Sequence, residues 1–165
     1  MPIDFFENKC KSTSNKIEFG LCDDSSPAEN PAYINEDDDS KWIGIVKNNT
    51  NKEIEFIAID SCIDIRRPDG KLESRCDGLL SFDTNLIFVE LKSRESKKWF
   101  KTGREQLTNT IRIFKDNYDI SKYNSISGNV CNGLRPQSHA GQATNIQQFF
   151  DETGLILKGD RTIKI

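Results

Sequence analysis

Residues 76–92 read CDGLLSFDTNLIFVELK, and this stretch decides both the fold class and the candidate site. Two apolar runs flank a polar break, a pattern typical of neighbouring strands that are covered on both faces. Asp77 opens the first run, and Glu90 and Lys92 close the second on a shared face, because alternate residues of a strand point the same way. Charged groups in such surroundings are costly unless they contact each other, a metal ion or a substrate. The stretch therefore predicts a functional site at one end of two adjacent strands.

The register of the two strands decides whether these side chains can act together. If Phe82 paired with Leu86, Asp77 would lie opposite Leu91 and would face away from Glu90. An offset of one residue, or a bulge, brings Asp77 and Glu90 to the same face. We therefore expect the polar break to shift the register by one residue.

Bulk composition indicates a soluble globular protein. The chain has 165 residues, of which 35% are hydrophobic and 30% are charged, and this length suits one domain. The first residues lack the basic and apolar character of a signal peptide, and no segment is apolar enough for a membrane span. We expect a cytoplasmic protein without a membrane partner.

The five cysteines match neither a disulfide framework nor a zinc site. Their number is odd and no CxxC pair occurs. Cys62 and Cys76 fall in apolar surroundings, which favour buried free thiols.

The remaining periodicity predicts a mixed α/β domain. A helix is expected at 96–115, because Trp99, Gly103, Leu107, Ile111 and Phe114 recur at the spacing of one buried stripe. Turn residues at 48–51 predict a hairpin between strands at 41–47 and 52–60. The N-terminal residues 1–50 are otherwise expected to form an irregular or β extension with one strand at 17–21. Further elements are expected as a strand at 125–131, a short helix at 145–151, and strands at 155–158 and 161–165.

The predicted site has the chemistry of a divalent-cation centre. Mg²⁺ prefers oxygen ligands, which Asp77, Glu90 and the carbonyl of Leu91 could supply. Such a cation activates water and stabilises charge at phosphorus. Lys92 could position the attacking water, deprotonate it or neutralise the transition state. A basic cluster suited to a phosphate backbone follows directly in the sequence: Arg94, Lys97, Lys98, Lys101 and Arg104.

A plainer interpretation of the same residues stays open. A Glu-x-Lys sequence at a strand end is common and is often a solvated surface pair. The apolar strand before it, the Asp that opens the neighbouring strand and the amphipathic helix that follows favour a functional site.

The order Asp77, hairpin, Glu90-Leu91-Lys92 resembles the core motif of the PD-(D/E)XK nuclease superfamily, and Gln106 resembles the glutamine on the following helix of many members. The resemblance covers about residues 55–152. It implies a restriction-endonuclease-like mixed sheet flanked by helices, here with the N-terminal β-hairpin extension. It also implies Asp77 and Glu90 as ligands of Mg²⁺ or Mn²⁺, Lys92 as the catalytic lysine and Gln106 as an accessory group.

Two positions depart from the family pattern. Cys76 stands where many members have proline, which contributes no ligand. No early helix carries the additional acidic residue of many members, and Asp60 and Asp64 are candidate substitutes.

The expected function is metal-dependent hydrolysis of phosphodiester bonds, with DNA favoured over RNA as the substrate and with the defence against or processing of foreign DNA as a candidate role. One alternative is a catalytically silent module of this fold that binds nucleic acid or a protein partner. A homodimer is also left open. A third interpretation is an ordinary mixed α/β interaction domain.

Overall fold

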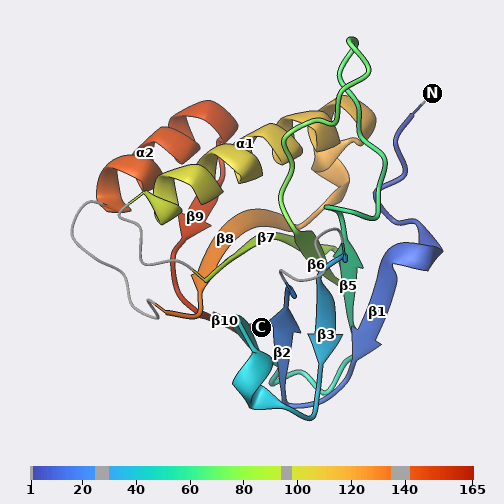
Figure 1. The fold of residues 1–165 in the computed structure, drawn as a ribbon, viewed down its shortest axis with the longest axis vertical. Helices are drawn as coiled ribbons and strands as arrows, with labels where there is room; N and C mark the ends of the chain where they lie inside the picture. Colours follow the sequence, from blue (N-terminus) through green and yellow to red (C-terminus); the bar gives the residue numbers. More distant parts are fainter. Residues whose placement is uncertain (1, 25–29, 94–97, 135–141) are drawn as a thin grey trace.

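A six-stranded mixed sheet lies at the centre of the protein, with two helices on one face and a four-stranded sheet on the other (Figure 1). The computed structural model describes residues 2–24, 30–93, 98–134 and 142–165. This arrangement confirms the predicted mixed α/β class.

The six-stranded sheet contains the two strands that carry the candidate site at its centre. Its order is β1-β5-β6-β7-β8-β9; the first four strands pair antiparallel, and β7, β8 and β9 pair parallel. The strands are β1 (Lys11–Ser14), β5 (Ile54–Ala58), β6 (Gly78–Phe82), β7 (Asn85–Lys92), β8 (Ser125–Asn132) and β9 (Ile156–Lys158).

Helix α1 (Trp99–Asn117) lies across this sheet next to α2 (Gln142–Thr153) (Figure 1). All five residues of the predicted stripe are buried. Gly103 allows α1 to approach β8 closely, because a Cβ atom built there would lie 2.8 Å from a Val130 methyl carbon. Helix α2 ends at Gly154, which has a φ of 76° and whose N–H donates to the carbonyl of Phe150.

The second sheet has the order β10-β4-β2-β3 and joins the N-terminal part of the chain to its last strand. Its strands are β2 (Glu18–Cys22), β3 (Tyr33–Asn35), β4 (Gly44–Lys47) and β10 (Thr162–Lys164). Single 3-10 turns occur at Asn8–Cys10, Asp39–Lys41 and Ile120–Lys122.

The predicted hairpin between 41–47 and 52–60 is wrong. Strand β4 pairs with β2 and β10, whereas β5 pairs with β1 and β6 in the other sheet. The turn chemistry exists, because the side chain of Asn48 donates to the carbonyl of Lys52 and accepts from Thr50. Val46 and Phe56 are both buried in the core between the sheets, so burial brings the two strands face to face rather than edge to edge.

Two hydrophobic clusters cover the two faces of β6 and β7. Leu79 and Phe88 belong to the cluster under the helices, whereas Leu80 and Val89 belong to the cluster between the sheets. This explains why both strands are apolar throughout, as the sequence indicated.

Cys62 is not the free thiol that its surroundings suggested, because it is disulfide-bonded to Cys10. The two cysteines are 52 residues apart in sequence, and the antiparallel pairing of β1 with β5 brings them together. Cys76 is buried and free as predicted, as are Cys22 and Cys131.

No helix in the described parts of the chain has the length and apolar character that crossing a membrane requires.

Candidate functional site

The register of β6 and β7 is shifted by one residue, as the candidate site requires. Phe82 pairs with Asn85, and Gly78 pairs with Val89. One position further along, Asp77 and Glu90 are opposite each other. Asp83 in the two-residue turn has a φ of 52°, a left-handed conformation that Asp tolerates better than most side chains.

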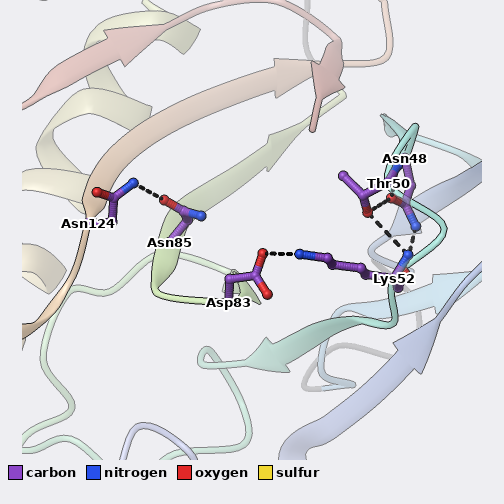
Figure 2. A network of polar contacts seen from close by, with 6 residues as sticks. All are labelled: Asn48, Thr50, Lys52, Asp83, Asn85 and Asn124. Carbon is purple, nitrogen blue, oxygen red and sulfur yellow. Dashed lines mark hydrogen bonds and ion pairs between the residues drawn. The ribbon is translucent and has the colours of Figure 1, made fainter.

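Polar contacts from two neighbouring segments fix this turn (Figure 2). Lys52, which precedes β5, forms a 2.8 Å ion pair with Asp83. On the other side, the side chain of Asn124 donates to Asn85, and the backbone N–H of Asn124 donates to the carbonyl of Thr84. The segments that lead into β5 and β8 are therefore tied to the turn between β6 and β7 that sets the register.

Asp77 is buried and fixed from several directions. Its Oδ2 atom accepts a 2.7 Å hydrogen bond from the backbone N–H of Leu91, and its own carbonyl accepts from the N–H of Ile59. The preceding N–H, of Cys76, donates to the hydroxyl of Thr110 on α1 at 2.7 Å. Burial raises the pKa of Asp77 from 3.8 to about 7, against the lowering effect of the Leu91 hydrogen bond.

Glu90 is only 3% exposed and has one oxygen without a partner. Its Oε1 atom lies 3.2 Å from the Nζ atom of Lys92, whereas Oε2 is buried and makes no hydrogen bond. Burial raises the pKa of Glu90 well above its ordinary value, and the neighbouring charge of Asp77 raises it further.

Lys92 connects β7 to α1. Its Nζ atom donates a 2.6 Å hydrogen bond to Oε1 of Gln106, in addition to its ion pair with Glu90. The predicted accessory glutamine is thus in direct contact with the predicted catalytic lysine. The structure brings Asp77, Glu90, Lys92 and Gln106 together.

These four side chains line a cleft of about 480 Å³. Its remaining walls include two acidic residues, Asp23 and Asp60. Asp23 directly follows β2, so the four-stranded sheet forms part of the site. Burial raises the pKa of Asp23, as does the charge of Asp60. Asp23 was not among the predicted site residues, although a charged residue at the end of a buried strand is the same signal that indicated Glu90 and Lys92.

The two candidates for an additional acidic residue are placed differently. Asp60 lines the cleft and forms a 2.9 Å ion pair with Arg75. Asp64 is exposed, pairs with Arg66 at 2.9 Å and borders a different pocket. Only Asp60 belongs to the site.

The predicted basic cluster is divided. Lys98 and Lys101 are exposed near the start of α1, whereas Arg94 and Lys97 lie outside the described residues. Arg104 has a side chain that is 4% exposed and connects α1 to α2, with its Nε atom 2.9 Å from Oδ1 of Asn145. Its guanidinium also lies 3.6 Å from Glu152. Arg104 therefore supports helix packing instead of presenting a charge to solvent.

The donor set of the site suits a hard cation. Leu91 lines the cleft, and because its N–H is directed at Asp77, its carbonyl points to the same side of the strand. Two carboxylates and this carbonyl are oxygen ligands of the kind that Mg²⁺ prefers. Within the described residues, no group of three His, Cys, Asp or Glu side chains is placed to hold a metal ion, so a cation here depends on the Asp77 and Glu90 pair.

Comparisons of this chain with protein-family models, with curated proteins and with solved structures give no match.

Proposed function

We propose that this protein is a divalent-metal-dependent nuclease that hydrolyses phosphodiester bonds, with DNA as the favoured substrate. The buried pair of Asp77 and Glu90 carries this proposal. Two buried carboxyl groups line the same cleft, and one oxygen of Glu90 makes no hydrogen bond. A buried pair of this kind is costly unless a cation offsets its charge.

The residues that would hold Mg²⁺ or Mn²⁺ are Asp77, Glu90 and, through its carbonyl, Leu91. The orphaned Oε2 atom of Glu90 supports the fit, because a buried carboxylate oxygen lacking a hydrogen-bond donor is suited to a metal ligand. When bound, the cation supplies charge stabilisation at phosphorus and lowers the pKa of a coordinated water.

Lys92 would act on the phosphate rather than serve only as a structural ion pair. An ammonium group has three donors, and Glu90 and Gln106 account for two of them. The third can reach into the cleft that Lys92 lines. Gln106 and Glu90 hold the Nζ atom, so Lys92 is positioned to orient the attacking water and to neutralise charge in the transition state.

Substrate contacts outside the cleft would come from Lys98 and Lys101. Both are exposed at the start of α1, on the same helix as Gln106. Lysines of this kind bind phosphates without reading sequence, so cleavage would be guided by the structure of the DNA or by a partner.

The acidity of the cleft favours a second candidate, a catalytically silent module that binds a protein partner in the cleft, or nucleic acid outside it. Four carboxylate residues and one lysine line the cleft, and Arg104 is engaged with α2. A cleft with this charge repels phosphate unless a cation is bound.

The test is cleavage of plasmid and single-stranded DNA in Mg²⁺, in Mn²⁺ and in EDTA, by the wild type and by Glu90→Gln and Lys92→Met. The exposed cross-strand pair of Glu18 and Lys47 offers matched controls, Glu18→Gln and Lys47→Met. We expect cleavage that requires the metal, is lost in both site variants and is retained in both controls.

Cleavage that persists in Glu90→Gln and Lys92→Met would disprove the proposed site. DNA binding without cleavage by any form would favour the silent module.

A further inference from the structure

The backbone of Asp77 is held by hydrogen bonds from two different elements. On the helix side, Thr110 accepts from the N–H of Cys76 and donates to the carbonyl of Gln106. On the other side, the N–H of Ile59 donates to the carbonyl of Asp77 at 2.8 Å. The position of the Asp77 carboxylate therefore depends on where Ile59 is held.

Ile59 is fixed by the turn that directly follows it. Its carbonyl accepts hydrogen bonds from the N–H of Cys62 at 3.2 Å and from the N–H of Ile63 at 2.9 Å. Ser61 within this turn has a φ of 63°, a conformation that a serine adopts at a cost. Residues 59–63, called the Ile59 turn below, thus adopt a strained backbone conformation that contacts from outside the turn can stabilise.

The disulfide between Cys62 and Cys10 supplies that support. Cys10 directly precedes β1, and Lys11 at the start of β1 pairs with Ile57 of β5. The same turn also carries Asp60, which lines the cleft and pairs with Arg75. The disulfide therefore restrains both Asp60 and the N–H of Ile59, which donates to the carbonyl of Asp77.

This disulfide can be reached by a reductant. Cys62 lines an open pocket of about 380 Å³ together with Ser61 and the exposed Leu72, whereas Cys10 is buried. A reductant that approaches this disulfide would therefore do so from the pocket, at Cys62. The other three cysteines are buried and unpaired, so Cys62 is the cysteine of this chain that combines a disulfide with a place beside a pocket.

We propose that the Cys10–Cys62 disulfide is a redox-sensitive latch on the cleft, an inference that rests on the proposed metal-dependent function. A dithiol reductant breaks the S–S bond: two electrons and two protons pass to the cysteines as two thiols, and the reductant becomes a disulfide. The Ile59 turn is then released from β1. The hydrogen bond from the N–H of Ile59 to the carbonyl of Asp77 then weakens, and the cleft binds the cation with lower affinity.

The test compares three samples: the oxidised wild type, the wild type reduced with a phosphine, and Cys10→Ser/Cys62→Ser. A phosphine replaces a dithiol here because dithiols chelate metals. Mn²⁺ affinity is measured by calorimetry, and hydrogen exchange of single amides is followed by NMR. Val130, in the centre of β8, serves as the control amide, and phosphine treatment of the double variant is the control for effects unrelated to the disulfide.

We expect the reduced protein and the double variant to bind Mn²⁺ about 10-fold more weakly, in the range seen when groups that orient metal ligands are removed. The Ile59 amide should lose more protection than Val130, whose exchange follows global stability, and the phosphine should leave the double variant unchanged.

Equal Mn²⁺ affinity and equal Ile59 exchange in both redox states would overturn the latch while leaving the proposed function intact. An equal loss of protection at Val130 and at Ile59 would also overturn it, because the disulfide would then act only on the stability of the whole fold. If the oxidised wild type binds no Mn²⁺, the proposed function fails. Exchange of the Ile59 amide then decides by itself whether the disulfide stabilises the hydrogen bond from Ile59 to Asp77.

Discussion

The Nζ atom of Lys92 lies 2.6 Å from Oε1 of Gln106, so a single short hydrogen bond joins β7 to α1 at the candidate site. Gln106→Leu removes this hydrogen bond, so that of the two contacts of the Lys92 ammonium described above only the ion pair with Glu90 is left. We expect cleavage to slow by about 10- to 100-fold, the cost of misplacing a reacting group. Steady-state kinetics measures the change. Gln147→Leu, which removes an exposed helix glutamine paired with Asp151, is the control and should retain full activity.

The raised pKa of Asp77 predicts that the metal-free protein loses stability as pH rises. The pKa of Asp77 is 3.8 in the unfolded state and about 7 in the folded state. At a pH between these two values, the folded protein holds a proton on Asp77 that the unfolded protein has released. Stability should therefore fall by an amount on the order of 3 kcal/mol from about pH 4 to about pH 7. Urea unfolding in EDTA across this window measures the change.

Asp77→Asn should reduce that pH dependence, because asparagine has no charge to bury, and the part that comes from the buried Glu90 should remain. Asp64→Asn, at an exposed position outside the cleft, should leave the dependence unchanged. A wild-type stability that rises over this window would contradict the burial of an ionisable Asp77.

Binding of Mg²⁺ should reverse the loss of stability above neutral pH. A ligand that binds only the folded state at about 100 times its dissociation constant adds about 2.7 kcal/mol. Thermal unfolding at about pH 8 should show a melting temperature that rises with Mg²⁺ concentration and returns to its metal-free value in EDTA. The shift should disappear in Asp77→Asn and persist in Glu18→Gln. A shift of equal size in Asp77→Asn would place the cation elsewhere.

The turn that sets the register can be tested through Asp83. Its φ of 52° suits Asp, Asn or Gly but opposes a β-branched side chain. Asp83→Val should therefore lower the free energy of unfolding by about 1–2 kcal/mol. Asp83→Gly also loses the ion pair with Lys52, an exposed contact of small worth, and should stay within about 1 kcal/mol of the wild type. Equal losses in both variants would mean that the ion pair, not the backbone conformation, matters.

Reduction of the disulfide should lower global stability without unfolding the protein. The bond closes a loop across a sequence separation of 52 residues, for which loop entropy gives about 4 kcal/mol. Chemical denaturation with and without a phosphine measures this value. The double variant Cys10→Ser/Cys62→Ser should match the reduced wild type, and a reduced protein more stable than the oxidised form would contradict the estimate.

Features that depend on neighbouring residues could be predicted from the sequence. The stripe of α1 is a local pattern, and all its predicted members are buried. The contacts of Asp77, Glu90 and Lys92 follow from two adjacent strands and a two-residue turn, so the sequence could state the required register in advance. Gln106 was found because it borders a stripe of known period.

Features that depend on distant pairing could not be predicted in this way. The hairpin between 41–47 and 52–60 failed because turn chemistry does not reveal whether two strands meet at their edges or at their faces. Asp23 was missed because β2 comes close to the site only when the four-stranded sheet packs against the six-stranded sheet. The bond between Cys10 and Cys62 depends on the pairing of β1 with β5, which no spacing of cysteines indicates.

Arg104 illustrates a different difficulty. In the sequence, Arg104 is the last member of a cluster of basic residues. Its position on the helix is compatible both with exposure to solvent and with contact to a second helix. Only the placement of α2, with Asn145 and Glu152 facing it, decides between the two.

The parallel pairing of β10 with β4 has a consequence for the order in which the protein is made. Arg161, next to β10, donates hydrogen bonds to the carbonyls of Trp42 and Ile43, and Ile43 lines the cleft. On the ribosome, residues 77–106 emerge long before 161–164, so a nascent chain has its carboxylates, its lysine and its glutamine while one wall of the cleft still lacks its support. Strand β10 therefore completes the sheet that β2, β3 and β4 began, and we expect the cleft to assemble after translation has passed residue 164.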